Sequence, residues 1–290
     1  MAKIGKPIRV DNIIQFRADD SLLAQLNAVA SRFHTPVGVL CRQWVAERLS
    51  REIRLDQAAV EYWRDSRQEE IIRLLHSDME SGPVQIIHMQ PLSGTIEIDP
   101  QAVRKLQSSL APIERTDEYT GRINVHGYKT QKIFRDSKRV NAYVQVFRTG
   151  QLESVRILRE LSDPKGIFGE QTDDELIRAI WSYSSALQAL KVSLPIQIAI
   201  TYLGLKDFTL RTRDIYGPTC EFDTADMSLP VIDVTEWPQV GCLESTAETL
   251  RPSINVFWNA AGFDKSASYT AGGKWRGPLD SFGRPNDQHS

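Results

Sequence analysis

The sequence predicts an α+β protein that consists of a short strand–helix–helix unit and a larger domain with a mainly antiparallel sheet. Residues 9–18 alternate in the manner of a strand, and residues 19–49 change to the apolar spacing of helices. Farther along, apolar strand-like runs and helical stretches follow one another without strict strand–helix–strand alternation. This order favours an antiparallel sheet over a parallel one.

The first unit begins with residues 9–18, whose successive side chains alternate between the two faces of a strand. Asp19 or Asp20 then supplies the cap of a helix, because a carboxylate there accepts the free N–H groups of the first turn. After a short break, Thr35 caps a second helix and Pro36 takes its first position, where a missing N–H costs nothing. One unpaired strand within about 40 residues is too little to build a core. We therefore expect the strand to pair with its copy from a second chain.

Residues 9–50 resemble the ribbon-helix-helix family of DNA-binding proteins, with an alternating strand, an acidic cap followed by LLAQL, a polar turn and a second helix. In that family two strands form an antiparallel ribbon whose outward side chains enter the major groove. The resemblance implies that Gln15 and Arg17 read bases, since glutamine pairs with adenine and arginine with guanine. Ile13, where the family usually has a polar residue, contributes at most a contact with a thymine methyl group. The alternative is a ribbon that only dimerises.

Backbone phosphates are the second expected contact of this unit. The resemblance places N–H groups at the start of the second helix against a phosphate, those of Thr35, Val37 and Gly38. A basic arm before the strand consists of Lys3, Lys6 and Arg9. Residues 1–55 hold nine Lys and Arg against five Asp and Glu, whereas the whole chain has a net charge of −2. For Lys3 and Lys6 the alternative is a solvated terminus.

Composition divides the chain into four parts. Residues 1–55 form the first unit, residues 56–82 a charged helical connector and residues 83–275 the α+β domain. Residues 276–290 are rich in Gly, Ser, Pro and Asp, so we expect a disordered tail. Three widely spaced cysteines, the lack of a membrane-length apolar run and the lack of a signal peptide indicate a cytoplasmic protein without a membrane partner.

In the larger domain, apolar runs predict strands, and three-to-four-residue periodicity predicts helices. Strands are expected at residues 84–92, 122–130, 139–150, 151–161, 195–205 and 230–234, and helices at residues 100–110, 173–192 and 245–263. The strands before and after Thr149 and Gly150 form an antiparallel hairpin. Thr172 or Asp173 is expected to cap the second of these helices.

A second resemblance covers residues 58–276. The blocks IIHMQPL, RINVHGYKT, PIQIAITYLGLK and SYTAGGKW are similar to the C-terminal region of bacterial proteins that carry a Schlafen-type AlbA-like domain, which are often described as ATP-binding or transcriptional regulators. The AlbA-like domain itself is missing from this chain. A nucleotide or nuclease role of that domain therefore does not transfer, and the resemblance implies a fold rather than a chemistry.

The sequence has no catalytic or cofactor-binding motif. Phosphate-cradling glycine loops, the Gly-x-Ser-x-Gly elbow and the His-Glu-x-x-His helix are all absent, and the five histidines are scattered. We therefore expect no catalytic residues, no cofactor and no metal. His88 lies in an apolar run and is expected to be a hydrogen-bonded core residue. The pair Asp173 and Asp174 is expected to cap a helix rather than bind a cation.

Four polar residues near one turn form a candidate ligand or anion pocket: Arg122, Asn124, Tyr128 and Arg148. Packing of a hairpin is the alternative interpretation of this set.

These observations predict a sequence-specific DNA-binding regulator that acts as a homodimer, or a higher oligomer, on double-stranded DNA. The second domain would then be a sensor or an assembly module. The alternative is a non-enzymatic subunit of a bacterial defence or mobile-element complex, in which the first unit dimerises or docks a partner. An enzyme is the third possibility, and the missing catalytic motifs count against it.

Overall fold

The computed structural model describes residues 20–32, 35–79, 81–92, 97–113, 119–133, 139–158, 161–162, 165–212 and 219–278. The predicted ribbon and basic arm lie outside these residues, and with them Lys3, Lys6, Arg9, Ile13, Gln15 and Arg17. Most of the predicted tail also lies outside them. The chain forms two compact units, residues 1–57 and residues 58–290.

The described part of the first unit consists of α1 (Asp20–Arg32) and the beginning of α2 (Val37–Ser77). The carbonyl of Pro36 accepts hydrogen bonds from the N–H groups of Val39 and Leu40, at 2.9 and 3.0 Å. The second helix therefore begins at Val37, one residue later than predicted, and Pro36 rather than Thr35 is in the N-cap position.

Helix α2 is a single helix of 41 residues and crosses the division between the two units. The sequence predicts a helix that ends near residue 49, followed by one or two charged helices. No glycine or proline occurs between Val39 and Ser81, so no residue of the usual helix-stopping types interrupts it.

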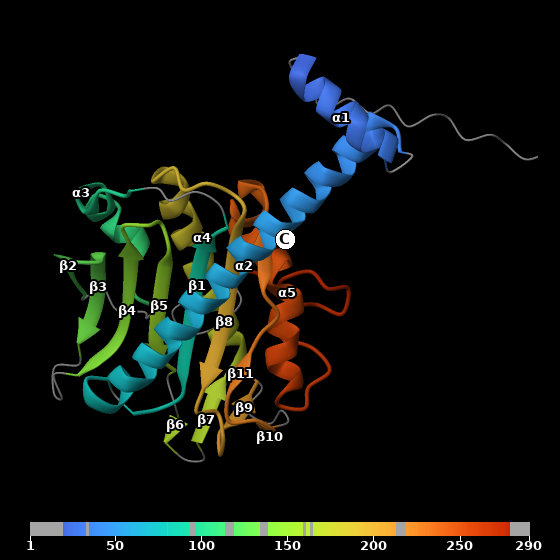
Figure 1. The fold of residues 1–290 in the computed structure, drawn as a ribbon. Coiled ribbons are helices and arrows are strands. Elements are labelled where there is room, and N and C mark those ends of the chain that lie inside the picture. The colour runs from blue at the N-terminus through green and yellow to red at the C-terminus, as the bar shows by residue number, and fades with distance from the viewer. Residues whose placement is uncertain are drawn as a thin grey trace, which may run out of the picture. The chain divides into compact units, whose positions relative to one another are not determined.

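The larger unit is built on an eight-stranded sheet with the order β11-β8-β1-β5-β4-β3-β2, in which β12 also pairs with β8 (Figure 1). The strands are β1 (Val84–Pro91), β2 (Thr120–Asn124), β3 (Gly127–Ile133), β4 (Val140–Phe147), β5 (Leu152–Ile157), β8 (Ile196–Leu203), β11 (Met227–Ser228) and β12 (Ile232–Val234). All of its described pairings are antiparallel. The α+β class and the mainly antiparallel sheet are thus confirmed, as is the β4–β5 hairpin.

The predicted strand at residues 122–130 is two strands. Gly127 begins β3 with a φ of 149°, and a Cβ at this position would collide with the carbonyl oxygen of Val146. Only glycine allows the chain to turn this closely against β4.

A smaller sheet has the order β10-β9-β7-β6, with β7 and β9 parallel. Its strands are β6 (Leu161–Ser162), β7 (Lys165–Phe168), β9 (Thr209–Arg211) and β10 (Thr219–Glu221). They contain two to four residues each, too few for an apolar alternation to be recognised in the sequence.

Helices cover both faces of the large sheet. The main core lies between one face and helices α4 (Gly169–Ala189) and α5 (Leu243–Asn259). A smaller core lies on the other face, where Ile71 of α2 packs among Val84, Ile86 and Val155. The described part of the unit also contains three short helices: α3 (Pro100–Arg104), η1 (Gln107–Leu110) and η2 (Trp237–Val240). Figure 1 shows the part of α2 within the larger unit, residues 58–77, running diagonally across the strands.

The predicted capping of α4 by Thr172 or Asp173 is wrong. The helix begins at Gly169, and its N-cap is Phe168, so Asp173 lies inside the helix. Gly169 permits the earlier start, because a Cβ there would collide with the indole of Trp258. Asp174 forms an ion pair with Arg178, one turn farther along, at 3.0 Å.

Candidate functional site

A row of polar side chains crosses five strands of the large sheet on the face that α2 covers. Its members are successive cross-strand partners: Arg122 on β2, Lys129 on β3, Gln145 on β4, Glu153 on β5 and His88 on β1. Directly opposed residues of antiparallel strands point to the same side of a sheet. We call these five residues the polar row.

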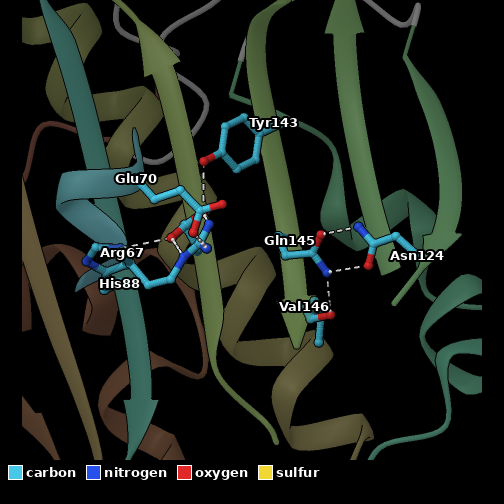
Figure 2. Close-up of polar contacts among 8 residues, drawn as sticks. Arg67, Glu70, His88, Asn124, Tyr143, Gln145 and Val146 are labelled. Atoms are coloured by element: carbon cyan, nitrogen blue, oxygen red, sulfur yellow. Dashed lines mark hydrogen bonds and ion pairs between the residues drawn. The ribbon is translucent and has the colours of Figure 1, made fainter. Parts of the chain in front are cut away.

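Glu153, near one end of the polar row, is fully buried. The guanidinium of Arg67 donates to both of its carboxylate oxygens, each at 2.8 Å, and the hydroxyl of Tyr143 donates at 2.8 Å. The Nε2 atom of His88 lies 3.2 Å from the same carboxylate. Figure 2 shows Arg67, His88 and Tyr143 converging on this point. His88 is thus the hydrogen-bonded core residue that the sequence predicts.

Hydrogen bonding decides the charge of this carboxyl group. Burial alone would raise the pKa of Glu153, but the hydrogen bonds from Arg67 and His88 lower it to about 2. Burial also disfavours the charged form of Arg67 and so lowers its pKa. The hydrogen bonds and the charge of Glu153 outweigh this effect and raise the pKa of the guanidinium. The Glu153–Arg67 contact is therefore a buried ion pair, and its carboxylate has no basicity left for proton transfer near neutral pH.

One side of α2 supplies the groups that close over the polar row. Trp63, Arg67 and Ile71 are spaced four residues apart and therefore lie on one side of the helix. The Trp63 ring packs edge-on against His88 and Phe147, with centroid distances of 5.2 and 5.4 Å. The Arg67 guanidinium also lies 5.2 Å from the centre of the Phe147 ring. The apolar spacing of Trp63 and Ile71 is visible in the sequence. The sequence does not show that Arg67, on the same side of the helix, pairs with a buried carboxylate.

The other end of the polar row carries two positive charges. Arg122 is exposed, and the Nζ atom of Lys129 lies 3.8 Å from the centre of the Tyr143 ring. Burial lowers the pKa of Lys129; Glu153 opposes this effect, and the charges of Arg122 and Arg67 add to it. The row is thus polarised, with its carboxylate neutralised at one end and two cations side by side at the other.

The structure separates the predicted pocket residues. Arg122 and Asn124 lie on the α2 side of the sheet, where the Asn124 amide donates to Gln145 at 2.7 Å (Figure 2). Tyr128 belongs to the core on the opposite side, and its hydroxyl donates to Gln107. The guanidinium of Arg148 donates to the carbonyl of Val125 at 3.3 Å, beside the β2–β3 turn.

The predicted phosphate contacts of the second helix are described in part. The N–H of Thr35 donates to the carbonyl of Ala30 at 3.0 Å, so this group is not available to a phosphate. Val37 and Gly38 lie in the first turn of α2, where N–H groups have no partner within the helix.

Asp173 forms a second buried polar cluster, between α4, α5 and the following segment. Its Oδ2 atom accepts from Trp258 Nε1 at 2.9 Å, from Ser266 Oγ at 2.6 Å and from Ser268 Oγ at 2.7 Å. Burial raises the pKa of Asp173 to about 7, although the three hydrogen bonds act in the opposite direction. The cluster fastens the segment after α5 to α4, a structural role.

Within the described ranges, no group of three or more His, Cys, Asp or Glu side chains can hold a metal ion. No helix in that part of the chain combines the length and apolarity needed to cross a membrane. No family model, curated protein or solved structure matches the chain.

Proposed function

We propose that the protein is a sequence-specific DNA-binding regulator that acts as a homodimer. The first unit, including the strand at residues 9–18, binds DNA as a paired ribbon, and the larger unit is a sensor or an assembly module. The basis is the strand, helix, turn and helix pattern of residues 9–50. Two helices, α1 and the beginning of α2, lie in this range and support the proposal.

Exposed apolar side chains on the two helices are the observation that carries this proposal. Four large ones stand out in the single chain: Leu22 and Leu23, each 46% exposed, Val39, 38% exposed, and Trp44, 43% exposed. We infer that these side chains belong to one interaction surface, since contiguous exposed apolar patches mark interaction sites. We expect a second copy of the unit to cover these side chains, because the strand predicted at residues 9–18 would need the same partner.

Selection of bound fragments from genomic DNA by the purified full chain tests the proposal. We expect enrichment of a short inverted repeat, since a two-fold symmetric dimer presents the same readers to two half-sites. The mass in solution, from light scattering, should be that of a dimer. A dimer that enriches no sequence would show that the ribbon only dimerises, and a monomer would refute the paired ribbon.

A further inference from the structure

Arg122 and Lys129 are direct cross-strand partners at the open end of the polar row. Like charges that face each other across two strands destabilise a sheet. Within the part of the chain that the structure describes, neither side chain forms an ion pair with a carboxylate. The carboxylate of the same row, Glu153, is already matched by Arg67. Glu153 and Asp78 raise the pKa of Lys129 through their charges, but neither forms an ion pair with it, so the two adjacent cations have no directly paired carboxylate among the described residues.

The surroundings of the two cations suit a ligand with several acceptor oxygens. Thr120 and Gln131 form the neighbouring cross-strand pair on the same side of the sheet, and both carry hydrogen-bond donors. Strand β2 is the last strand in the order of the sheet, and Thr120 and Arg122 are exposed. The Tyr143 ring beneath Lys129 Nζ stabilises the ammonium group without neutralising it.

We propose that Arg122 and Lys129, with Thr120 and Gln131 beside them, bind a phosphate monoester carried by a small molecule. A monoester has close to two negative charges at neutral pH, which match the two cations, whereas a phosphodiester within a nucleic acid has one. Arginine binds phosphate through a planar pair of N–H donors, and lysine contributes a point charge. The lowered pKa of Lys129 is consistent with this site, because a bound anion would relieve the charge crowding that helps to lower it. The site lies in the larger unit and is independent of DNA binding by the first.

Calorimetric titration of the full chain tests this site, with inorganic phosphate and a nucleoside 5′-monophosphate as probes at constant ionic strength. Saturable binding of both probes is expected. Arg122→Gln and Lys129→Gln should each weaken it at least about tenfold, the effect of losing a hydrogen bond to a charged group. Lys206→Gln is the matched control: Lys206 is exposed on the same unit, so the variant removes one charge elsewhere and should bind as the wild type does.

Two further measurements separate binding from folding and from the nucleic-acid alternative. In the absence of phosphate, Arg122→Gln should unfold at the same temperature as the wild type or higher, because it removes a like-charge contact. An oligonucleotide without terminal phosphates should bind this site more weakly than the monophosphate does. Equal weakening by Lys206→Gln, unsaturable phosphate binding, or oligonucleotide binding that Arg122→Gln weakens as much as it weakens monophosphate binding would each overturn the proposal.

Discussion

At the residue scale, Glu153 shows how an acidic side chain becomes part of a core. Its desolvation is offset by donors from α2, β1 and β4, and the resulting pKa near 2 lies below the usual glutamate value of about 4.3. The folded state therefore holds the carboxylate charged at pH values where the unfolded chain takes up a proton. This difference makes the stability of the larger unit depend on pH.

Acid should weaken the larger unit through Glu153. A group whose pKa is lower in the folded state contributes stability above its unfolded pKa and loses it as pH falls toward its folded pKa. We expect a loss of about 3 kcal/mol from this group between about pH 5 and pH 2. Urea unfolding at a series of pH values measures it. Glu153→Gln should be less stable at pH 7 and should show a smaller change over this range; an unchanged slope would contradict the assignment.

Asp173 should make the stability of the larger unit depend on pH in the opposite direction to Glu153. Its pKa of about 7 exceeds the usual aspartate value of about 3.9, so the folded state keeps a proton that the unfolded chain releases. Stability should therefore fall by about 4 kcal/mol as pH rises from about 4 to about 7. Asp173→Asn preserves an oxygen that accepts from Trp258, Ser266 and Ser268, and should remove this pH dependence. A variant that retains the wild-type slope in urea unfolding would show that another group titrates.

A further prediction for a single residue concerns Arg17, which we propose reads a base. Arg17→Ala should weaken binding to the selected operator by about 1–3 kcal/mol, the discrimination of one bidentate base contact, while the dimer persists. Arg32→Ala is the control, since Arg32 is an exposed cation of α1 outside the ribbon. Mobility-shift titrations compare the three proteins. Equal affinity of the wild type and Arg17→Ala would refute the base contact.

At the element scale, α2 is held to the sheet by one side of the helix. Trp63, Arg67 and Ile71 contribute an aromatic contact, an ion pair and a buried apolar side chain, respectively. The ion pair differs from the aromatic contact and the apolar side chain in what its loss leaves behind. Removal of the guanidinium leaves a buried carboxylate without its charge partner.

Arg67→Ala should therefore destabilise the larger unit by about 3–5 kcal/mol. Arg73→Ala, on the exposed side of the same helix, should change its stability by no more than about 0.5 kcal/mol. Equilibrium unfolding in urea, followed by circular dichroism and tryptophan fluorescence, gives both values. Similar losses of unfolding free energy in the two variants would mean that the ion pair does not stabilise the larger unit.

The elements were more predictable from the sequence than the site they form. The hairpin around Gly150 and the apolar strand β1 follow from local patterns, and Asp99 and Pro100 mark the start of α3 as a cap and a first-turn proline do. The polar row depends on register instead. His88 and Glu153 are 65 residues apart and meet because β1 inserts between β5 and β8, which no local signal in β1 specifies.

The predicted capping role of Asp173 illustrates the same limit. Two adjacent acidic residues before an apolar periodic stretch are typical of a helix start, so the local pattern indicates a start at this point. The close approach of Trp258 to Gly169 instead allows the helix to begin one turn earlier. Tertiary contacts therefore decided both the helix start and the burial of the carboxyl group.

At the scale of the whole molecule, both hydrophobic cores that the described residues form lie within residues 58–290. A fragment of residues 58–290 should therefore unfold cooperatively in urea, with an ellipticity typical of mixed α+β structure. The same fragment should not bind the operator in mobility-shift titrations, because it lacks the proposed ribbon. An unfolded fragment would show that the first unit is required for folding, and a fragment with full operator affinity would place DNA binding in the larger unit.

Strand β1 has a consequence for synthesis on the ribosome. It is the first strand of the large sheet to be made, yet its two neighbours are β5 and β8, which follow about 60 and 110 residues later in the chain. Both edges of this apolar strand stay unpaired until those segments emerge, which is the situation that favours association between nascent chains. At translation rates of about 5–20 residues per second, the exposure lasts at least several seconds. Growth temperature and chaperone supply should therefore influence the yield of soluble protein.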